Sequence, residues 1–169
     1  MTNPLLRNVR IESILAELPC PQLVLELGCG SDDAAAQYFS RACPRTRWIG
    51  IDRDVTRLAS LPHWVVQADI RRLPLWAQAD LVVIRHPDID RRPVDWQAAL
   101  AVVPHLLVKG GLLLITTYSL HEYETIGKWV GKLPFQPRKL EEMSLAAADL
   151  VGRDRFFHYL ALPANPTNI

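Results

Sequence analysis

Short apolar segments alternate with helical patterns along most of the chain. Segments that are typical of buried strands cover residues 23–27, 47–51, 64–67, 81–84 and 112–116. Helical patterns cover residues 4–18, 32–41, 54–60, 96–107 and 119–132. Strands that alternate with helices indicate βαβ units, and strands that are apolar on both faces indicate a mostly parallel sheet covered by helices on both sides. Because crossovers are right-handed, the pattern predicts an open, doubly wound α/β sheet.

The last part of this pattern differs from the rest. Two strands are expected at residues 139–145 and 156–162, and the segment 146–154 between them is too short for a helical crossover. These strands are therefore expected to pair as an antiparallel hairpin. Before them, Lys109-Gly110-Gly111 is expected to end a helix in a turn, and Pro104 is expected to kink that helix.

Composition limits the classes that remain. With 169 residues, 49% of them hydrophobic, the chain is expected to form one domain over residues 1–169, with a leading helix in 1–20 and a core in 22–162. No apolar run approaches the roughly 18–20 residues of a membrane span, and residues 1–10 lack the apolar stretch of a signal peptide. Cys20, Cys29 and Cys43 have no metal-ligand spacing, so reduced thiols in a cytoplasmic protein are expected.

A glycine-rich turn follows the first predicted strand. Glu26-Leu27-Gly28-Cys29-Gly30 runs directly into an Ala-rich helix. Glycines at such a turn let a ligand approach the backbone, although a tight turn without a ligand explains them too. A dinucleotide is disfavoured because Asp33 stands where its fingerprint has a third glycine, and Asp32 and Asp33 would repel a pyrophosphate.

Acidic residues end the next two predicted strands. Asp52 ends the second strand, where a carboxylate can accept hydrogen bonds from ribose hydroxyls. Its alternative role is to cap the following helix, for which Asp54 is better placed. Asp69 follows the third strand and could accept from the amino group of a purine, with Ile70 packed on the base. The order of glycine turn, acid and acid predicts one nucleoside-like ligand at this edge of the sheet.

From residue 22 to 162 the chain resembles the class I S-adenosylmethionine-dependent methyltransferases, with Asp32 as a departure where many members have a glycine. Glu26–Gly30, Gly50-Ile51-Asp52 and Gln67-Ala68-Asp69-Ile70 resemble the family's cofactor, ribose and adenine segments. The resemblance implies a three-layer, seven-stranded sheet of order 3-2-1-4-5-7-6 with strand 7 antiparallel, and S-adenosyl-L-methionine as cofactor. The residues that it assigns to the cofactor are Glu26, Gly28, Cys29, Gly30, Asp52, Arg53, Asp69, Ile70 and Arg85.

By the same resemblance, the end of the fourth strand faces the transferable methyl group. His86 is the candidate base, Asp88 would orient it, and Arg85 would hold a carboxylate or phosphate of the substrate or the carboxylate of the cofactor. The alternative is an ion pair between Arg85 and Asp88 beside a rigid His86-Pro87 turn. Tyr118 and His121 are further candidates for the rim of the site, or helix-entry packing.

These observations predict a minimal methyltransferase with an open site and an unassigned acceptor, which can be RNA, protein or a small molecule. A homodimer that closes the site is an open possibility. One alternative is a non-catalytic S-adenosylmethionine-binding or partner-stabilising domain, and a weaker one is a nicotinamide-dependent enzyme. A further alternative is an RNA enzyme, because His86-Pro87-Asp88 followed by Arg91 and Arg92 faintly resembles tRNA guanine-N7 methyltransferases. The net charge of +1 gives no general attraction to nucleic acid.

Overall fold

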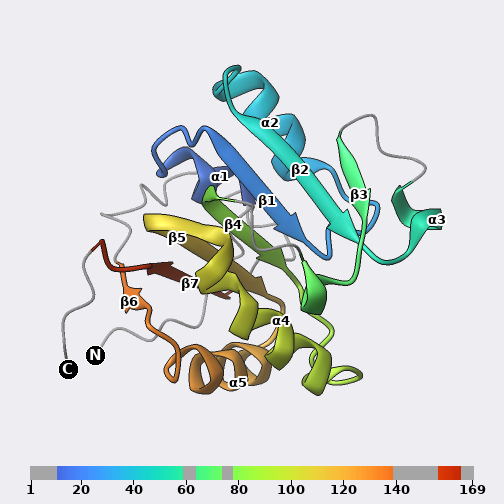
Figure 1. Cartoon of the computed structure of the whole chain (residues 1–169), viewed down its shortest axis with the longest axis vertical. Coiled ribbons are helices and arrows are strands. Elements are labelled where there is room, and N and C mark those ends of the chain that lie inside the picture. The colour runs from blue at the N-terminus through green and yellow to red at the C-terminus, as the bar shows by residue number, and fades with distance from the viewer. Residues whose placement is uncertain (1–10, 59–63, 74–77, 139–155, 165–169) are drawn as a thin grey trace.

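A computed structural model describes residues 11–58, 64–73, 78–138 and 156–164. Its strands form one seven-stranded sheet of order β3-β2-β1-β4-β5-β7-β6 (Figure 1). The neighbours from β3 to β5 pair in parallel, whereas β7 is antiparallel to both β5 and β6. The expected order and the reversed strand are therefore confirmed. The strands are β1 (Leu23–Leu27), β2 (Arg47–Asp52), β3 (Val65–Gln67), β4 (Ala79–Arg85), β5 (Leu107–Thr117), β6 (Gln136–Pro137) and β7 (Phe156–Ala161).

Helices cover both faces of the sheet and produce two separate cores. On one face, α1 (Ile11–Ala16) and α2 (Ala34–Ala42) enclose a core that contains Phe39. On the other face, α4 (Pro93–Leu106) and α5 (Leu120–Val130) enclose a core that contains Trp96. The short helices α3 (Val55–Leu58) and η1 (Ile70–Arg72) follow β2 and β3. None of the described helices has the length and hydropathy needed to cross a membrane.

Strand β4 shows how the apolar pattern creates these two cores. Its buried residues alternate, with Leu81 and Val83 in the α1–α2 core and Val82 and Ile84 in the α4–α5 core. Successive side chains of a strand point to opposite faces, so a central strand must be apolar at every position. The uninterrupted apolar run in this strand follows from burial on both sides.

The structure corrects one expectation about the chain after α4. Lys109-Gly110-Gly111 does not form a turn, because β5 begins at Leu107 and runs through it. Gly110 has a φ of +78°, its N–H donates to Leu162 O, and the pairing with β4 shifts register between Ala79 and Leu81. The expected strand at residues 139–145 lies outside the described residues, within which β7 pairs with β6 in antiparallel fashion. Pro104 lies inside α4, as predicted.

The expectation of reduced thiols was also wrong. Cys20 and Cys43 form a disulfide, with Cα atoms 5.6 Å apart. The bond joins the segment before β1 to the residue that ends α2. Cys29 is the free and buried thiol in the part of the chain that the structure describes.

Candidate functional site

A cavity of about 570 Å³ opens where the parallel strands end. Strand order reverses between β1 and β4 at this edge, which is where open α/β sheets bind ligands. Strands β1 to β4 each contribute a lining residue at or just after the carboxyl end, and the remaining wall comes from α3, η1, α4 and the loop before α4. The lining residues are Gly28, Asp52, Arg53, Asp54, Arg57, Ala68, Asp69, Ile70, Arg71, His86, Asp88, Arg91, Arg92, Asp95 and Trp96.

The glycine turn after β1 is held in place from two sides. The N–H groups of Gly28 and Cys29 donate to Ile51 O, at 2.7 and 3.2 Å. Gly28 has a φ of +69°, and a Cβ added to it would lie 2.8 Å from Cη2 of Trp96. Glycine is therefore required here both by the left-handed conformation and by the indole that packs against it.

Asp52 is the last residue of β2, and its buried carboxylate lines the cavity. Its Oδ2 accepts from the N–H of Gly30 at 3.0 Å, and its Oδ1 accepts from the N–H of Asp54 at 2.9 Å. Asp54 in turn caps α3, as predicted, by accepting from the N–H and hydroxyl of Thr56. These bonds favour the ionised carboxylate and hold the pKa of Asp54 below its usual value. Asp52 thus fixes the glycine turn while it faces the cavity.

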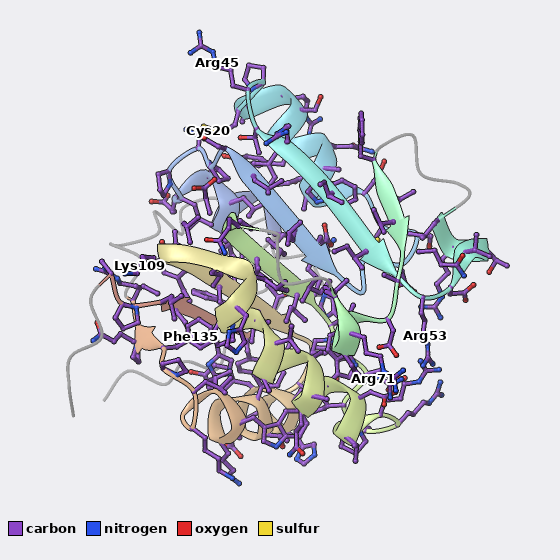
Figure 2. The ribbon with its side chains drawn as sticks, in the orientation of Figure 1. Cys20, Arg45, Arg53, Arg71, Lys109 and Phe135 are labelled. Atoms are coloured by element: carbon purple, nitrogen blue, oxygen red, sulfur yellow. A yellow bond between two sulfur atoms is a disulfide. The ribbon has the colours of Figure 1, made fainter. Side chains whose placement is uncertain are left out.

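A charged network joins β2, η1 and α4 across the cavity. Arg71 donates to Asp69 through Nε, at 2.9 Å from Oδ1, and through Nη2, at 2.6 Å from Oδ2. The hydrogen bonds from Arg71 lower the pKa of Asp69 to about 2. The same guanidinium donates to Asp95 at 2.7 Å, and Arg53 lies 3.7 Å from the second oxygen of Asp95. Figure 2 shows Arg53 and Arg71 on the same side of the molecule.

Glu26 and Cys29 lie beneath the glycine turn and do not line the cavity. Glu26 is 1% exposed and accepts from the indole N–H of Trp48 at 3.0 Å. The indole crosses Gly50, where an added Cβ would overlap its ring. Burial, with the charges of Glu26 and Asp52, raises the pKa of Cys29 to about 12, so its thiol stays protonated. Glu26 and Cys29 therefore support the glycine turn from within the protein and not from the cavity.

The end of β4 places His86 in the cavity wall with an unusual backbone. Its φ is +48°, in the left-handed region, while its N–H donates to Thr116 O at 2.9 Å. Non-glycine residues held in such conformations cluster at functional sites. Arg85 pairs with Asp32 at 3.0 Å, a partner that the sequence did not indicate. Asp88 lines the cavity beside His86.

The structure brings together most of the residues that the sequence singled out. Around the cavity it places Gly28, Asp52, Arg53, Asp69, Ile70, His86 and Asp88. Four others are absent from the lining: Glu26, Cys29, Gly30 and Arg85. Tyr118 is 50% exposed, and His121 lies 3.6 Å from Asp90, both away from that lining. The described residues contain no cluster of ligands suited to a metal ion.

Some lining residues carried no sequence signal for a site. Trp96 belongs to the apolar stripe of α4, and that stripe alone indicates only core packing. Asp95 and Arg71 enter through a network between elements far apart in sequence. The packing of the left-handed Gly28 against Trp96 becomes visible only once the helix is placed against the turn.

Comparison with solved structures assigns the fold. Human N-acetylserotonin methyltransferase in complex with SAM matches with a TM-score of 0.64 at 15% identity, covering 90% of this chain and 51% of that chain. The plantazolicin methyltransferase BpumL, in complex with SAH, gives 0.60 at 14%, covering 85% and 76%. The N-methyltransferase NodS from Bradyrhizobium japonicum WM9, in complex with SAH, gives 0.56 at 14%, covering 90% and 82%.

These matches show the fold of class I S-adenosylmethionine-dependent methyltransferases. This chain spans about half the length of several of the solved methyltransferases that it matches, between 43% and 51% for three of them. No protein-family model and no curated protein sequence matches the chain.

Proposed function

We propose that this protein binds S-adenosylmethionine in the cavity and transfers its methyl group to an acceptor. One observation carries the proposal. A single cavity joins the glycine turn after β1, the acid that ends β2, the acidic segment after β3 and the histidine after β4. In the class I fold these are the positions that a nucleoside-bearing methyl donor requires, and the solved neighbours include complexes with SAM and SAH.

The donor groups around the cavity fit this cofactor. Asp52 would accept hydrogen bonds from the ribose hydroxyls, because each of its oxygens accepts one backbone N–H and has an acceptor site left. Arg53 and Ile70 would flank the base, and Asp69 would accept from its amino group in exchange for Arg71. When bound, S-adenosylmethionine supplies an electrophilic methyl group on a sulfonium. Asp32 and Asp33, which follow the glycine turn, suit that cationic centre better than they would suit a pyrophosphate.

The end of β4 would handle the acceptor. A hydroxyl or amine nucleophile that gains a methyl group loses a proton, and the imidazole of His86 can accept it. Asp88 would act with it as a polar neighbour on the same wall. Arg85 would serve as a positioning residue, since its ion pair with Asp32 ties the end of β4 to the turn after β1.

The proposal is tested by calorimetry with S-adenosylmethionine, S-adenosylhomocysteine and NAD. We expect both adenosyl compounds to bind and NAD not to bind. Asp52→Asn should weaken binding by about 1–3 kcal/mol, because a hydrogen bond to a buried carboxylate is lost or weakened. Binding of NAD alone, or of none of the three, would overturn the proposal.

Asp80→Asn is the matched control for that substitution. Like Asp52, Asp80 accepts from two backbone N–H groups, those of Gln22 and Leu23, at 2.9 and 2.8 Å. It lies at the opposite edge of the sheet, where β1 and β4 begin. An equal loss of cofactor affinity in both variants would mean that Asp52 acts through stability and not through contact with the cofactor.

A further inference from the structure

Two arginines in the cavity wall differ from the other three. Arg53 pairs with Asp95, Arg57 with Asp54, and Arg71 with Asp69 and Asp95. Arg91 and Arg92 are exposed in the loop between β4 and α4 and line the same cavity. Among the described residues, neither has an acidic side chain within ion-pair distance.

The charges near His86 leave a local positive excess. Asp95 is shared by Arg53 and Arg71, and Asp69 is bound by Arg71, so these acids are compensated. Asp88 is then the carboxylate that remains on this wall, against the two guanidinium groups of Arg91 and Arg92. Helix α4 begins at Pro93, directly after them, and its N-terminus adds a partial positive charge. An anion placed here would meet uncompensated donors.

We infer that Arg91 and Arg92 bind an anionic group of the methyl acceptor, and that the acceptor is a small acid carrying a carboxylate or a phosphate. The inference rests on the proposed function, in which the β1–β3 side of the cavity holds the cofactor and leaves the β4–α4 side for the acceptor. Guanidinium groups bind both anions through paired N–H donors. Arg91 and Arg92 share a wall with His86, so the anion would orient the acceptor beside the proposed base.

The chain as a whole favours a small acid over a nucleic acid. Nonspecific binding to nucleic acid depends on many phosphate contacts and on a broadly basic surface. This chain has 19 basic and 18 acidic residues, and three of the five lining arginines are neutralised by lining acids. Two unpaired guanidinium groups match one carboxylate or one phosphate.

The test measures anion binding to protein that is already saturated with S-adenosylhomocysteine. Sodium phosphate and sodium succinate are the probes, added at constant ionic strength against sodium chloride, and the readout is the concentration that gives half of the maximal rise in Tm. The probe that binds more tightly identifies the group as phosphate or carboxylate. Failure of S-adenosylhomocysteine to bind would count against the proposed function, whereas failure of both anions to bind would overturn only this inference.

The double variant Arg91→Gln/Arg92→Gln should weaken binding of the preferred anion by at least about tenfold, because charge-assisted hydrogen bonds are lost. Arg91→Lys/Arg92→Lys keeps the charge without the paired donors and should give an intermediate affinity. The matched control is Arg45→Gln/Arg47→Gln, which changes two exposed arginines. Figure 2 shows Arg45 far from Arg53 and Arg71, and Arg47 is the first residue of β2. The inference is overturned if this control loses as much affinity as the first variant, or if the first variant loses none.

Discussion

Gly28 and Trp96 form a close contact on which the shape of the cavity depends. The indole rises from the first turns of α4, is 9% exposed and packs against the Cα of Gly28. The turn after β1 is therefore held against α4 as well as against β2. A side chain at position 28 would have to displace either the helix or the turn.

This contact predicts a cost that exceeds the cost of the backbone conformation alone. Gly28→Ala should lower the free energy of unfolding by more than the roughly 1–2 kcal/mol of a left-handed alanine, because the new Cβ also meets Trp96. Gly110→Ala is the control, since its φ is +78° and nothing lies within 4 Å of an added Cβ. Urea unfolding measures both variants, and equal losses would contradict the contact.

His158 is a partly buried titratable residue outside the cavity. It lies on β7, stacks on Tyr123 with ring centroids 4.2 Å apart, and has Nε2 2.9 Å from Tyr123 O. Burial disfavours the imidazolium and lowers the pKa of His158 below 6.5. The neutral ring, with Nε2–H as the donor, is the form that the fold stabilises.

This lowered pKa predicts the direction of a pH effect. The unfolded chain takes up a proton near pH 6.5, whereas folded His158 takes it up only at lower pH. The stability due to neutral His158 is thus complete above pH 6.5 and declines as the pH falls below it. His158→Gln should flatten this decline in unfolding measurements between pH 7.5 and 5, and the exposed His105→Gln should not. The same slope in the wild type and in His158→Gln would refute the assignment.

At the scale of elements, the disulfide joins the two helices that cover one face of the sheet. The segment after α1 enters β1 through Pro19, Cys20 and Pro21. The bond from Cys20 to Cys43 fastens this entry to the end of α2 across a separation of 23 residues. It therefore restrains the layer formed by α1 and α2 on one face of the sheet.

Reduction of the disulfide should lower the free energy of unfolding by about 3 kcal/mol, from the loop entropy that the bond removes from the unfolded chain. Denaturant unfolding with and without a reductant measures the difference. Cys20→Ser/Cys43→Ser should match the reduced wild type and show no response to the reductant. A wild type whose stability is the same in both conditions would contradict a formed bond.

Local signals explain which elements were predictable. Ser119 and Glu122 form the expected capping box at the start of α5, because that motif depends on neighbours in sequence. The strands of the parallel sheet were predictable because burial on two faces forces continuous apolar runs. Gly110-Gly111 is locally a turn signal as well, but the pairing of β5 with β4 and β7 overrides it. The pairing of Cys20 with Cys43 depends on how α2 packs, which spacing alone does not determine.

The same distinction between local sequence signals and tertiary contacts applies to the residues of the candidate site. Asp52, Asp69 and His86 were predictable because each stands at or just after a strand end, and the carboxyl ends of parallel strands meet at one edge. The roles of Arg71, Asp95 and Trp96 were not predictable from the sequence, since each depends on contacts between elements far apart in sequence. Sequence patterns therefore located the edge, and tertiary packing determined which side chains close the cavity around it.

At the scale of the whole molecule, the cavity lies where the strand ends meet helices that belong to separately packed layers. The two cores lie on opposite faces of the sheet, and the lining comes from four strand ends together with α3, η1 and α4. The network of Arg53, Asp95 and Arg71 holds three of these elements by exposed ion pairs, which contribute little stability individually. A ligand that contacts all of them would therefore stabilise the fold as a unit.

This arrangement predicts a thermal shift that depends on ligand concentration. S-adenosylhomocysteine at 100 times its Kd should add about 2.7 kcal/mol to the free energy of unfolding, because it binds the folded chain alone. For a chain of this size, that corresponds to a rise in Tm of about 5–10 °C. Scanning calorimetry over a ligand series measures it, with NAD as the control that should leave Tm unchanged. Because a ligand that binds the folded chain alone stabilises the whole cooperative unit, the transition should move as one with ligand concentration, and a Tm that does not respond to S-adenosylhomocysteine would contradict the binding.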